Sequence, residues 1–217
     1  MAQINLLDKL PITKRDVKKR EHERMLFDVN TAKKFGKEYF DGERRFGYGG
    51  YYYDGRWRPV AKKLIKHYNL TSESRILDIG CAKGFLLHDI QKLLPKCTVR
   101  GLDISEYARE NAYGDMKEKI DVGNAHRLPY GDDEFDLVIS INTIHNLPLK
   151  QCKEALSEIE RVSRGAKYIS VDAWKNDVEK QRILAWALTA RTCMHVQDWE
   201  EAFDETQYNG DYWFSVP

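Results

Sequence analysis

From residue 57 onward, the sequence alternates between short apolar runs and stretches with helical spacing. Apolar runs occupy residues 74–80, 98–105, 119–125, 135–142, 166–174 and 210–216. Helical spacing fills residues 57–70, 83–94, 106–114, 149–164, 178–192 and 196–206, and Gly165 is the expected end of the fourth of these helices. Strands that are apolar throughout and alternate with helices form a parallel sheet covered on both faces. The pattern therefore predicts an α/β fold with a Rossmann-like, doubly wound, mostly parallel sheet.

Five of the apolar runs carry a polar residue at or near their end. These residues are Asp78, Asp103, Asn124, Asn142 and Asp172. Each one alone is more typical of a helix cap or a turn. Ligands of such sheets bind at the carboxyl ends of the strands, near the point where the strand order reverses. Taken together, the five positions favour a binding crevice at that edge.

The segment "LDIGCAKG" joins the first strand to its helix. Gly80 and Gly84 permit a tight turn and a close approach of the backbone to a ligand. The helix that begins near Lys83 offers free N–H groups to a carboxylate or phosphate. A nicotinamide-binding turn would read G-x-G-x-x-G, whereas this turn reads D-x-G-x-x-x-G. The spacing therefore disfavours a nicotinamide-dependent oxidoreductase.

Three segments in this order resemble a known family. "ILDIGCAKG" resembles the first motif of the class I S-adenosylmethionine (SAM)-dependent methyltransferases, and "GLDIS" resembles their second. "NAHRLPYGDDEFDLVISINTIHNL" resembles the stretch from their third strand through their fourth. The resemblance covers residues 60–175 and implies a methyltransferase with SAM as its cofactor. One departure is Ala82, where the family usually has glycine, and we expect it to alter the turn slightly without loss of binding.

The resemblance also implies which residues bind the cofactor. They are Asp78, Gly80, Cys81, Ala82, Gly84, Asp103, Ile104, Asn124, Ala125 and Asn142. Asp78 would order the turn and reach the methionine amino group through water. Asp103 would accept both ribose hydroxyls, because a carboxylate has two accepting oxygens. Ile104 would pack on the adenine and Asn124 would meet its amino edge, while Asn142 would face the methionine end.

Two residues beyond the fourth and fifth strands are candidates for the chemistry. His145 is the best candidate for a base that removes a proton from a hydroxyl or amine acceptor. The alternative is a hydrogen-bonded histidine that caps the next element. Asp172 is a second candidate, with a hydrogen bond to substrate or a structural role as its alternatives. Asp172 and Asn142 are too few ligands for Mg²⁺, so no metal is expected.

Residues 1–56 precede the predicted domain at 57–217 and form an extension. Residues 1–45 predict one or two short helices, and the basic cluster from Lys14 to Arg24 is typical of a solvated helix face. The segment "RRFGYGGYYYDGRW" combines glycines with aromatic residues, which favours a lid over cofactor and substrate. Tyr51, Tyr53 and Arg56 are its candidate substrate-binding residues, joined by Asp172 and by Arg191 further along the chain. The alternative is that these aromatic residues pack the N-terminal helices onto the sheet.

Composition limits the acceptor and the compartment. The chain has 217 residues and a net charge of +1, which disfavours nucleic acid as the main partner. No apolar run approaches the ~20 residues of a membrane span, and no signal peptide is recognisable, so we expect a cytoplasmic protein. Four scattered cysteines without a CxxC pair indicate reduced thiols and no zinc site.

These limits favour a small-molecule acceptor. The chain resembles small stand-alone bacterial methyltransferases of surface-polysaccharide biosynthesis, and a phosphorylated or nucleotide-linked metabolite would suit Arg56 and Arg191. The alternatives are an RNA or protein methyltransferase and a non-catalytic SAM-binding protein. The family usually ends in an antiparallel hairpin, but Pro217 follows a single strand here. Either a strand is missing, or an open edge is covered by the N-terminal segment or by a partner subunit, as in a homodimer.

Overall fold

The computed structural model describes residues 1–11 and 15–217 and shows a sheet of seven strands in the order β3-β2-β1-β4-β5-β6, with β7 also on β5. The strands are β1 (Arg75–Ile79), β2 (Thr98–Asp103), β3 (Ile120–Val122), β4 (Phe135–Ile141), β5 (Ser163–Trp174), β6 (Met194–His195) and β7 (Asp211–Ser215). Neighbouring strands pair in parallel. The strand order reverses between β1 and β4, so the predicted doubly wound parallel sheet is confirmed.

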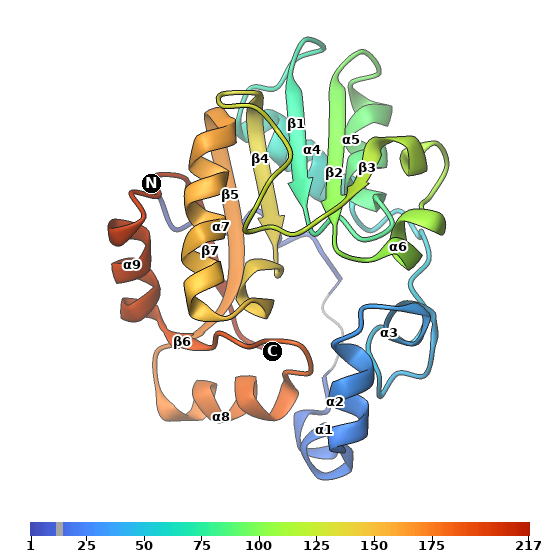
Figure 1. Cartoon of the computed structure of the whole chain (residues 1–217), viewed down its shortest axis with the longest axis vertical. Coiled ribbons are helices and arrows are strands. Elements are labelled where there is room, and N and C mark those ends of the chain that lie inside the picture. Colours follow the sequence, from blue (N-terminus) through green and yellow to red (C-terminus); the bar gives the residue numbers. More distant parts are fainter. Residues whose placement is uncertain (12–14) are drawn as a thin grey trace.

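Helices cover both faces of this sheet (Figure 1). The helices of residues 57–217 are α4 (Arg58–His67), α5 (Phe85–Leu93), α6 (Glu106–Glu110), α7 (Leu149–Val162), α8 (Asp177–Trp186) and α9 (Val196–Glu205), with short 3-10 turns η1 (Met116–Lys119) and η2 (Ile144–Asn146). Ile76 of β1 packs in one buried cluster with α4 and α5, and the next residue, Leu77, packs in another with α7 and α9. Because both faces of the strand are buried, apolar residues occupy its successive positions, such as Ile76 and Leu77, rather than alternate ones.

The expected role of Gly165 as the end of a helix was wrong. α7 ends at Val162, and Gly165 lies within β5. The register with β4 shifts just there, between the pairs Phe135–Ser163 and Leu137–Ala166. A Cβ on Gly165 would stand 2.7 Å from the carbonyl oxygen of Asp136, so the glycine permits the close backbone approach of a bulge.

The far edge of β5 carries both β6 and β7. β7 runs parallel to β5, in contrast to the antiparallel hairpin usual in the family. The N-terminal segment covers the free edge of β7: Ile4 N–H donates to the Tyr212 carbonyl at 2.9 Å, and Tyr212 N–H donates to the Ala2 carbonyl at 3.0 Å. Leu6 follows and is fully buried in the core. Of the two predicted covers for this edge, the structure has the N-terminal segment.

Three short helices, rather than the one or two predicted, follow that segment: α1 (Val17–Glu23), α2 (Leu26–Ala32) and α3 (Lys37–Asp41). They lie with α8 beyond the carboxyl ends of the strands (Figure 1). Lys14, the first residue of the predicted basic cluster, lies outside the described residues. Within residues 1–11 and 15–217, no helix combines the length and apolar character needed to cross a membrane.

Candidate active site

The turn between β1 and α5 has the backbone that its glycines predict. Gly80, Ala82 and Gly84 all have a positive φ, of 78°, 51° and 76°. A Cβ on Gly80 would lie 2.0 Å from the Thr143 hydroxyl oxygen, so this glycine is required by packing as well as by conformation. Ala82 tolerates a left-handed conformation that usually favours glycine. Ala82 thus shares the positive φ of the glycines on either side of it, and its effect on cofactor binding stays a prediction.

Asp103, the last residue of β2, holds this turn in place. Its Oδ2 accepts a hydrogen bond from the Ala82 N–H at 2.7 Å, and its Oδ1 accepts one from the Ser105 N–H at 2.9 Å. A carboxylate oxygen can accept more than one bond, so each keeps capacity for a hydroxyl. The next residue, Ile104, is exposed over about half its surface. A carboxylate beside an exposed apolar side chain suits a ribose with an attached base.

Asp78, near the end of β1, is a buried carboxyl group with no side-chain hydrogen-bond partner among the described residues. Burial and, to a lesser extent, the charge of Asp103 raise the pKa of Asp78 to about 7. An unpartnered buried carboxylate is costly, and a cationic ligand group would remove that cost. The position therefore fits the ammonium group of an amino acid.

Three further predicted cofactor positions are less open. The Cys81 thiol is buried, and burial raises its pKa well above the usual value, which is typical of a packing role. Ala125 is buried in the core with α7 and α9. Asn124 Oδ1 lies 2.6 Å from the His126 Nδ1, so its amide oxygen already has a partner. Asn124 keeps its amide N–H groups for a ligand.

The ends of β4, β5 and β7 bring together Asn142, His145 and Asp172. Ser215 connects them, because its hydroxyl donates to Asp172 Oδ1 at 2.8 Å and lies 3.3 Å from Asn142 Oδ1. His145 sits in η2, buried, and its Nδ1 accepts the backbone N–H of Asp172 at 3.1 Å. The three predicted residues thus form one polar cluster with a serine that sequence reasoning missed.

The contacts of His145 define its protonation state. Burial lowers the pKa of His145, and Asp172 only partly offsets this effect, so the imidazole is neutral near pH 7. Because Nδ1 accepts a bond from an N–H group, the single proton of the neutral ring lies on Nε2. This arrangement matches the predicted alternative of a hydrogen-bonded histidine. An Nε2–H group can donate to an acceptor oxygen but cannot remove a proton from it.

The aromatic segment covers the first turn. Tyr51 stacks on Phe85 with ring centroids 4.7 Å apart, and burial followed by the charge of Asp78 raises the pKa of the Tyr51 hydroxyl. The buried Lys83 donates to both carboxylate oxygens of Asp41, at 2.8 and 2.6 Å, and to the Tyr51 carbonyl at 2.8 Å. This ion pair ties α3 and the aromatic segment to the turn.

The side chains of the other predicted substrate-binding residues, Tyr53, Arg56 and Arg191, form no hydrogen bond or ion pair with the described residues of the polar cluster around His145. Tyr53 donates to Asp89 on α5 at 2.7 Å and stacks on Tyr113, so its contacts fit the packing alternative. Arg56 forms an ion pair with Asp54. Arg191 lies closer, because its backbone N–H donates to the His145 carbonyl at 3.0 Å while its side chain is exposed.

Sequence reasoning also missed Asp41 and the ion pair that Lys83 makes with it. Lys83 was noted only for the helix that begins beside it, and nothing local in the sequence pairs it with a residue 42 positions earlier. The one available signal for Ser215 was its place at the end of the last apolar run, where the other polar cluster residues also occur.

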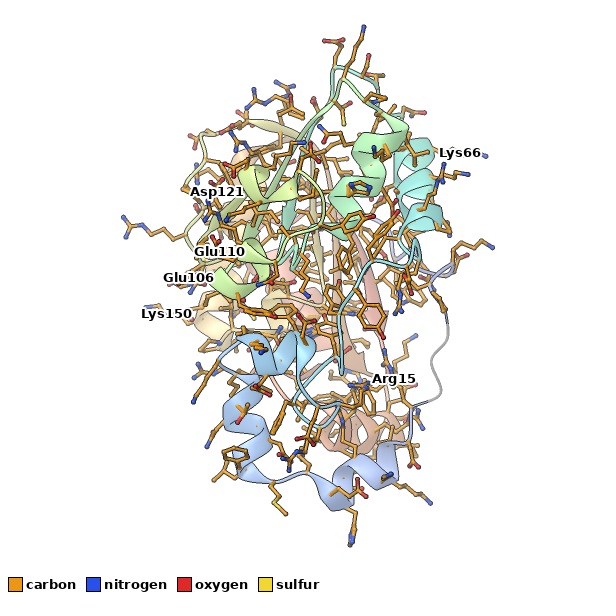
Figure 2. The ribbon with its side chains drawn as sticks, turned by 90° about the vertical axis from the view of Figure 1, so that its right-hand side faces the viewer. Arg15, Lys66, Glu106, Glu110, Asp121 and Lys150 are labelled. Carbon is orange, nitrogen blue, oxygen red and sulfur yellow. The ribbon has the colours of Figure 1, made fainter. Side chains whose placement is uncertain are left out.

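A hollow of about 560 Å³ lies elsewhere, between α6 and β3, and is lined mainly by charged side chains including Glu106, Glu110 and Asp121. Figure 2 shows these three residues on the same side of the molecule, away from Arg15. This hollow is rich in carboxylates and is separate from the acidic and apolar groups that line the strand ends. Within the described parts of the chain, no cluster of three or more His, Cys, Asp or Glu residues could hold a metal ion.

Comparison with known protein families identifies the family to which the chain with this site belongs. The sequence model of a family described as "Methyltransferase domain" matches residues 70–214. The chain belongs to this family. Its matched part contains the first turn, Asp103, Asn142, His145 and Asp172, so this methyltransferase domain has the class I fold and S-adenosylmethionine is its cofactor. The unpartnered Asp78 and the exposed Ile104 fit the two ends of that cofactor.

Curated relatives of this methyltransferase domain have different acceptors. The chain is 31% identical over 146 residues to a tRNA (carboxymethyluridine(34)-5-O)-methyltransferase of Arabidopsis thaliana, a match that covers 66% of this chain and 34% of that protein. It is 29% identical over 94 residues to a malonyl-[acyl-carrier protein] O-methyltransferase of Legionella pneumophila, covering 41% and 33%. The chain thus spans about a third of the length of both relatives.

Solved structures show the same fold at lower identity. A complex between the Haloferax volcanii Trm112 methyltransferase activator and a methyltransferase matches with a TM-score of 0.55 and 23% identity, covering 70% of this chain and 72% of the other. A geranyl diphosphate methyltransferase in complex with SAM matches with a TM-score of 0.56 and 14% identity, covering 69% and 64%.

Proposed function

We propose that this protein transfers a methyl group from SAM to an oxygen or nitrogen atom of a small anionic metabolite in the cytoplasm. The acceptor would be phosphorylated or nucleotide-linked, of the kind used in surface-polysaccharide biosynthesis. Residues 57–217 would bind cofactor and acceptor, and residues 1–56 would close over them. The observation that carries the proposal is the buried Asp78, which has no side-chain hydrogen-bond partner among the described residues, next to a polar cluster at the neighbouring strand ends.

The cofactor supplies a methyl group that is already activated, so the protein mainly positions the reactants. Asp78 would hold the amino group, Asp103 the ribose hydroxyls and Ile104 the adenine. The neutral His145 would donate its Nε2–H to the acceptor and fix its orientation. The proton released by the acceptor would pass to a carboxylate, and Asp172 at the same strand end is the group in place for it.

The cofactor part of the proposal is tested by thermal unfolding with SAM, S-adenosylhomocysteine and NADH. A ligand at ~100 times its dissociation constant adds about 2.7 kcal/mol of stability. We expect the first two compounds to raise the melting temperature and NADH to leave it unchanged. Asp103→Ala should abolish the increase. An unchanged melting temperature with SAM would contradict the proposal.

The pH profile of turnover distinguishes the role of His145 from that of Asp172. If Asp172 takes the proton, Asp172→Asn should lower kcat by about 10²–10⁴. His145→Gln, which keeps an N–H donor, should lower kcat less and leave the pH profile in place. A profile that loses its acidic limb in His145→Gln would instead make His145 the base.

An RNA acceptor is the second candidate, because the Arabidopsis relative acts on tRNA. The net charge of +1 provides no general excess of positive charge for a long phosphate backbone. Binding of tRNA to this protein should fall steeply with salt if RNA is the acceptor. Turnover of a small phosphorylated acceptor should change far less over the same salt range.

A further inference from the structure

Four arginines gather around one tryptophan where α1 meets the end of α8. The Arg20 guanidinium lies over the Trp186 ring, 4.1 Å from its centroid, and those of Arg15 and Arg44 lie 5.4 Å from it. Arg24 completes this arginine cluster by donating to the carbonyls of Leu184, Ala185 and Ala187. Figure 2 shows Arg15 in the layer of side chains between the N-terminal helices and the sheet.

The positive charge of the arginine cluster is not balanced within the described residues. No carboxylate there forms an ion pair with any of the four guanidinium groups, whereas the neighbouring Arg45 pairs with Asp28 and Glu43. The carbonyls at the end of α8 supply roughly half a negative elementary charge, the usual helix dipole, against four positive ones. An excess of positive charge therefore remains.

The pKa of Arg20 reflects the electrostatic repulsion within this arrangement. Burial first, and then the charges of Arg44 and Arg24, lower the pKa of Arg20 to about 10. Arg20 is held there by its N–H groups, which donate to the Trp186 and Arg44 carbonyls at 3.3 and 3.0 Å. A bound anion would offset the repulsion, and the planar, forked guanidinium is the group best suited to bind phosphate oxygens.

Tyr39 of α3 places the arginine cluster next to the cofactor-binding residues. Tyr39 packs against the buried cluster of Phe40, Ala82 and Ala108, so it contacts the first turn. Burial raises the pKa of its hydroxyl, the charge of Asp103 also raises it, and that of Arg20 lowers it. A second connection runs through the segment after α8, where Ala187 accepts from Arg24 and the Arg191 and Thr192 N–H groups donate to the His145 carbonyl. The cluster therefore borders the acceptor side of the proposed site.

We propose that Arg15, Arg20, Arg24 and Arg44, with Trp186, form the binding site for the phosphate or diphosphate group of the methyl acceptor. This inference rests on the proposed function, and it names the part of the molecule that would select an anionic acceptor. A small metabolite suits the site better than RNA, because the arginines gather at one point, around Trp186 and the last carbonyls of α8, and do not form a stripe along which a phosphate backbone could lie. The cluster would hold the anionic end of the acceptor while its reactive end meets His145 and Asp172.

Calorimetric titration of the full chain with inorganic pyrophosphate and with uridine 5′-diphosphate tests the site. We expect both probes to bind, and Arg20→Gln and Arg15→Gln to weaken each of them by at least about tenfold, the loss typical of a charge-assisted contact. Arg45→Gln is the matched control, because Arg45 already has carboxylate partners, and it should change the affinity less than about twofold. The Arg15 side chain forms no hydrogen bond with the described residues and is exposed, so its variant should fold even if Arg20→Gln does not.

SAM is titrated in parallel to separate the two proposals. Failure of SAM to bind would contradict the proposed function, whatever the probes do. Normal SAM binding together with no pyrophosphate binding, or equal losses in Arg20→Gln and Arg45→Gln, would overturn the arginine cluster as the site. An RNA stem-loop that binds more tightly than uridine 5′-diphosphate and loses affinity in Arg20→Gln would also overturn it, in favour of an RNA acceptor.

Discussion

Asp78 and Asp103 are two buried carboxyl groups on adjacent strands, and they differ in how they are satisfied. Asp103 accepts two backbone N–H groups, which partly offset the effect of burial on its pKa. Asp78 has no such donors among the described residues, and its pKa rises to about 7. The motif at the first turn predicted the position of Asp78, and the motif at the end of the next strand predicted that of Asp103, because each position depends on a local strand–turn sequence; their roles toward the cofactor stay predictions.

The raised pKa of Asp78 predicts pH-dependent cofactor binding. An ammonium group beside Asp78 favours the ionised carboxyl, so binding of SAM below pH 7 releases a proton. The affinity should therefore increase about tenfold per unit between about pH 5 and pH 7, as 1.36 kcal/mol per pKa unit requires. Titration calorimetry at several pH values measures this slope. Asp78→Asn should bind more weakly and with a flat profile, and a slope that persists in this variant would assign the proton to another group.

The same group affects the stability of the free protein. An unfolded aspartate titrates near its ordinary pKa of 3.8, whereas the folded one keeps its proton up to about pH 7. The folded state binds more protons in this window, so the free energy of unfolding falls as the pH rises from about 4 to 7. Asp78→Asn should remove this part of the fall.

The close packing at Gly80 predicts that a single added methyl group there lowers the free energy of unfolding strongly. Gly80→Ala places a side chain in the left-handed region and against Thr143, so we expect a loss of about 2–4 kcal/mol in denaturant unfolding. Adding Thr143→Gly removes the contacting atoms, so it should relieve the steric overlap but not the backbone strain. Gly131→Ala is the control, since its Cβ would be 3.7 Å from the nearest atom. A loss no larger than that of the control would contradict the assigned close contact.

At the scale of elements, the alternation of apolar and amphipathic segments predicted the strands well. It failed at the boundary between α7 and β5, because Gly165 has the same sequence signature as the end of a helix and as a bulge in a strand. It also overextended the helix after β5, which ends at Trp186 where Arg24 binds its last carbonyls. Both boundaries depend on residues far away in the chain, at Asp136 and Arg24.

The N-terminal segment gives an element-scale prediction. Leu6 is fully buried beside the edge that the segment forms on β7, so Leu6→Ala should lower the free energy of unfolding by about 2–5 kcal/mol. Leu26 of α2 is 76% exposed, and Leu26→Ala should change it by less than about 0.5 kcal/mol. Chemical denaturation of the two variants compares them directly. Equal, small effects would mean that the N-terminal segment does not contribute to the core.

At the scale of the whole molecule, the site combines parts of the chain that sequence patterns treat separately. The motif strands provide Asp78 and Asp103, but α3 adds Asp41 and Tyr39, and the last strand adds Ser215. The arginine cluster joins residues 15–44 to Trp186, which lies more than 140 positions later. No local periodicity or motif in the sequence indicates such contacts, because they depend on how the N-terminal helices pack across the end of the sheet.

This packing makes a last prediction about access to the site. The Lys83–Asp41 ion pair and the Tyr51 stack hold residues 37–57 against the first turn, so we expect SAM to enter and leave only when this segment opens locally. Bound SAM should therefore slow hydrogen exchange of amides in residues 37–57 and 80–84. The amides of Ile4 and Tyr212, at the far edge of the sheet, should exchange at the same rate with and without SAM. Lys83→Met should raise exchange in residues 37–57 of the free protein and leave the far edge unaffected. Protection that is equal at both places would indicate a global increase in stability instead, and no protection in residues 37–57 would mean that this segment does not cover the cofactor.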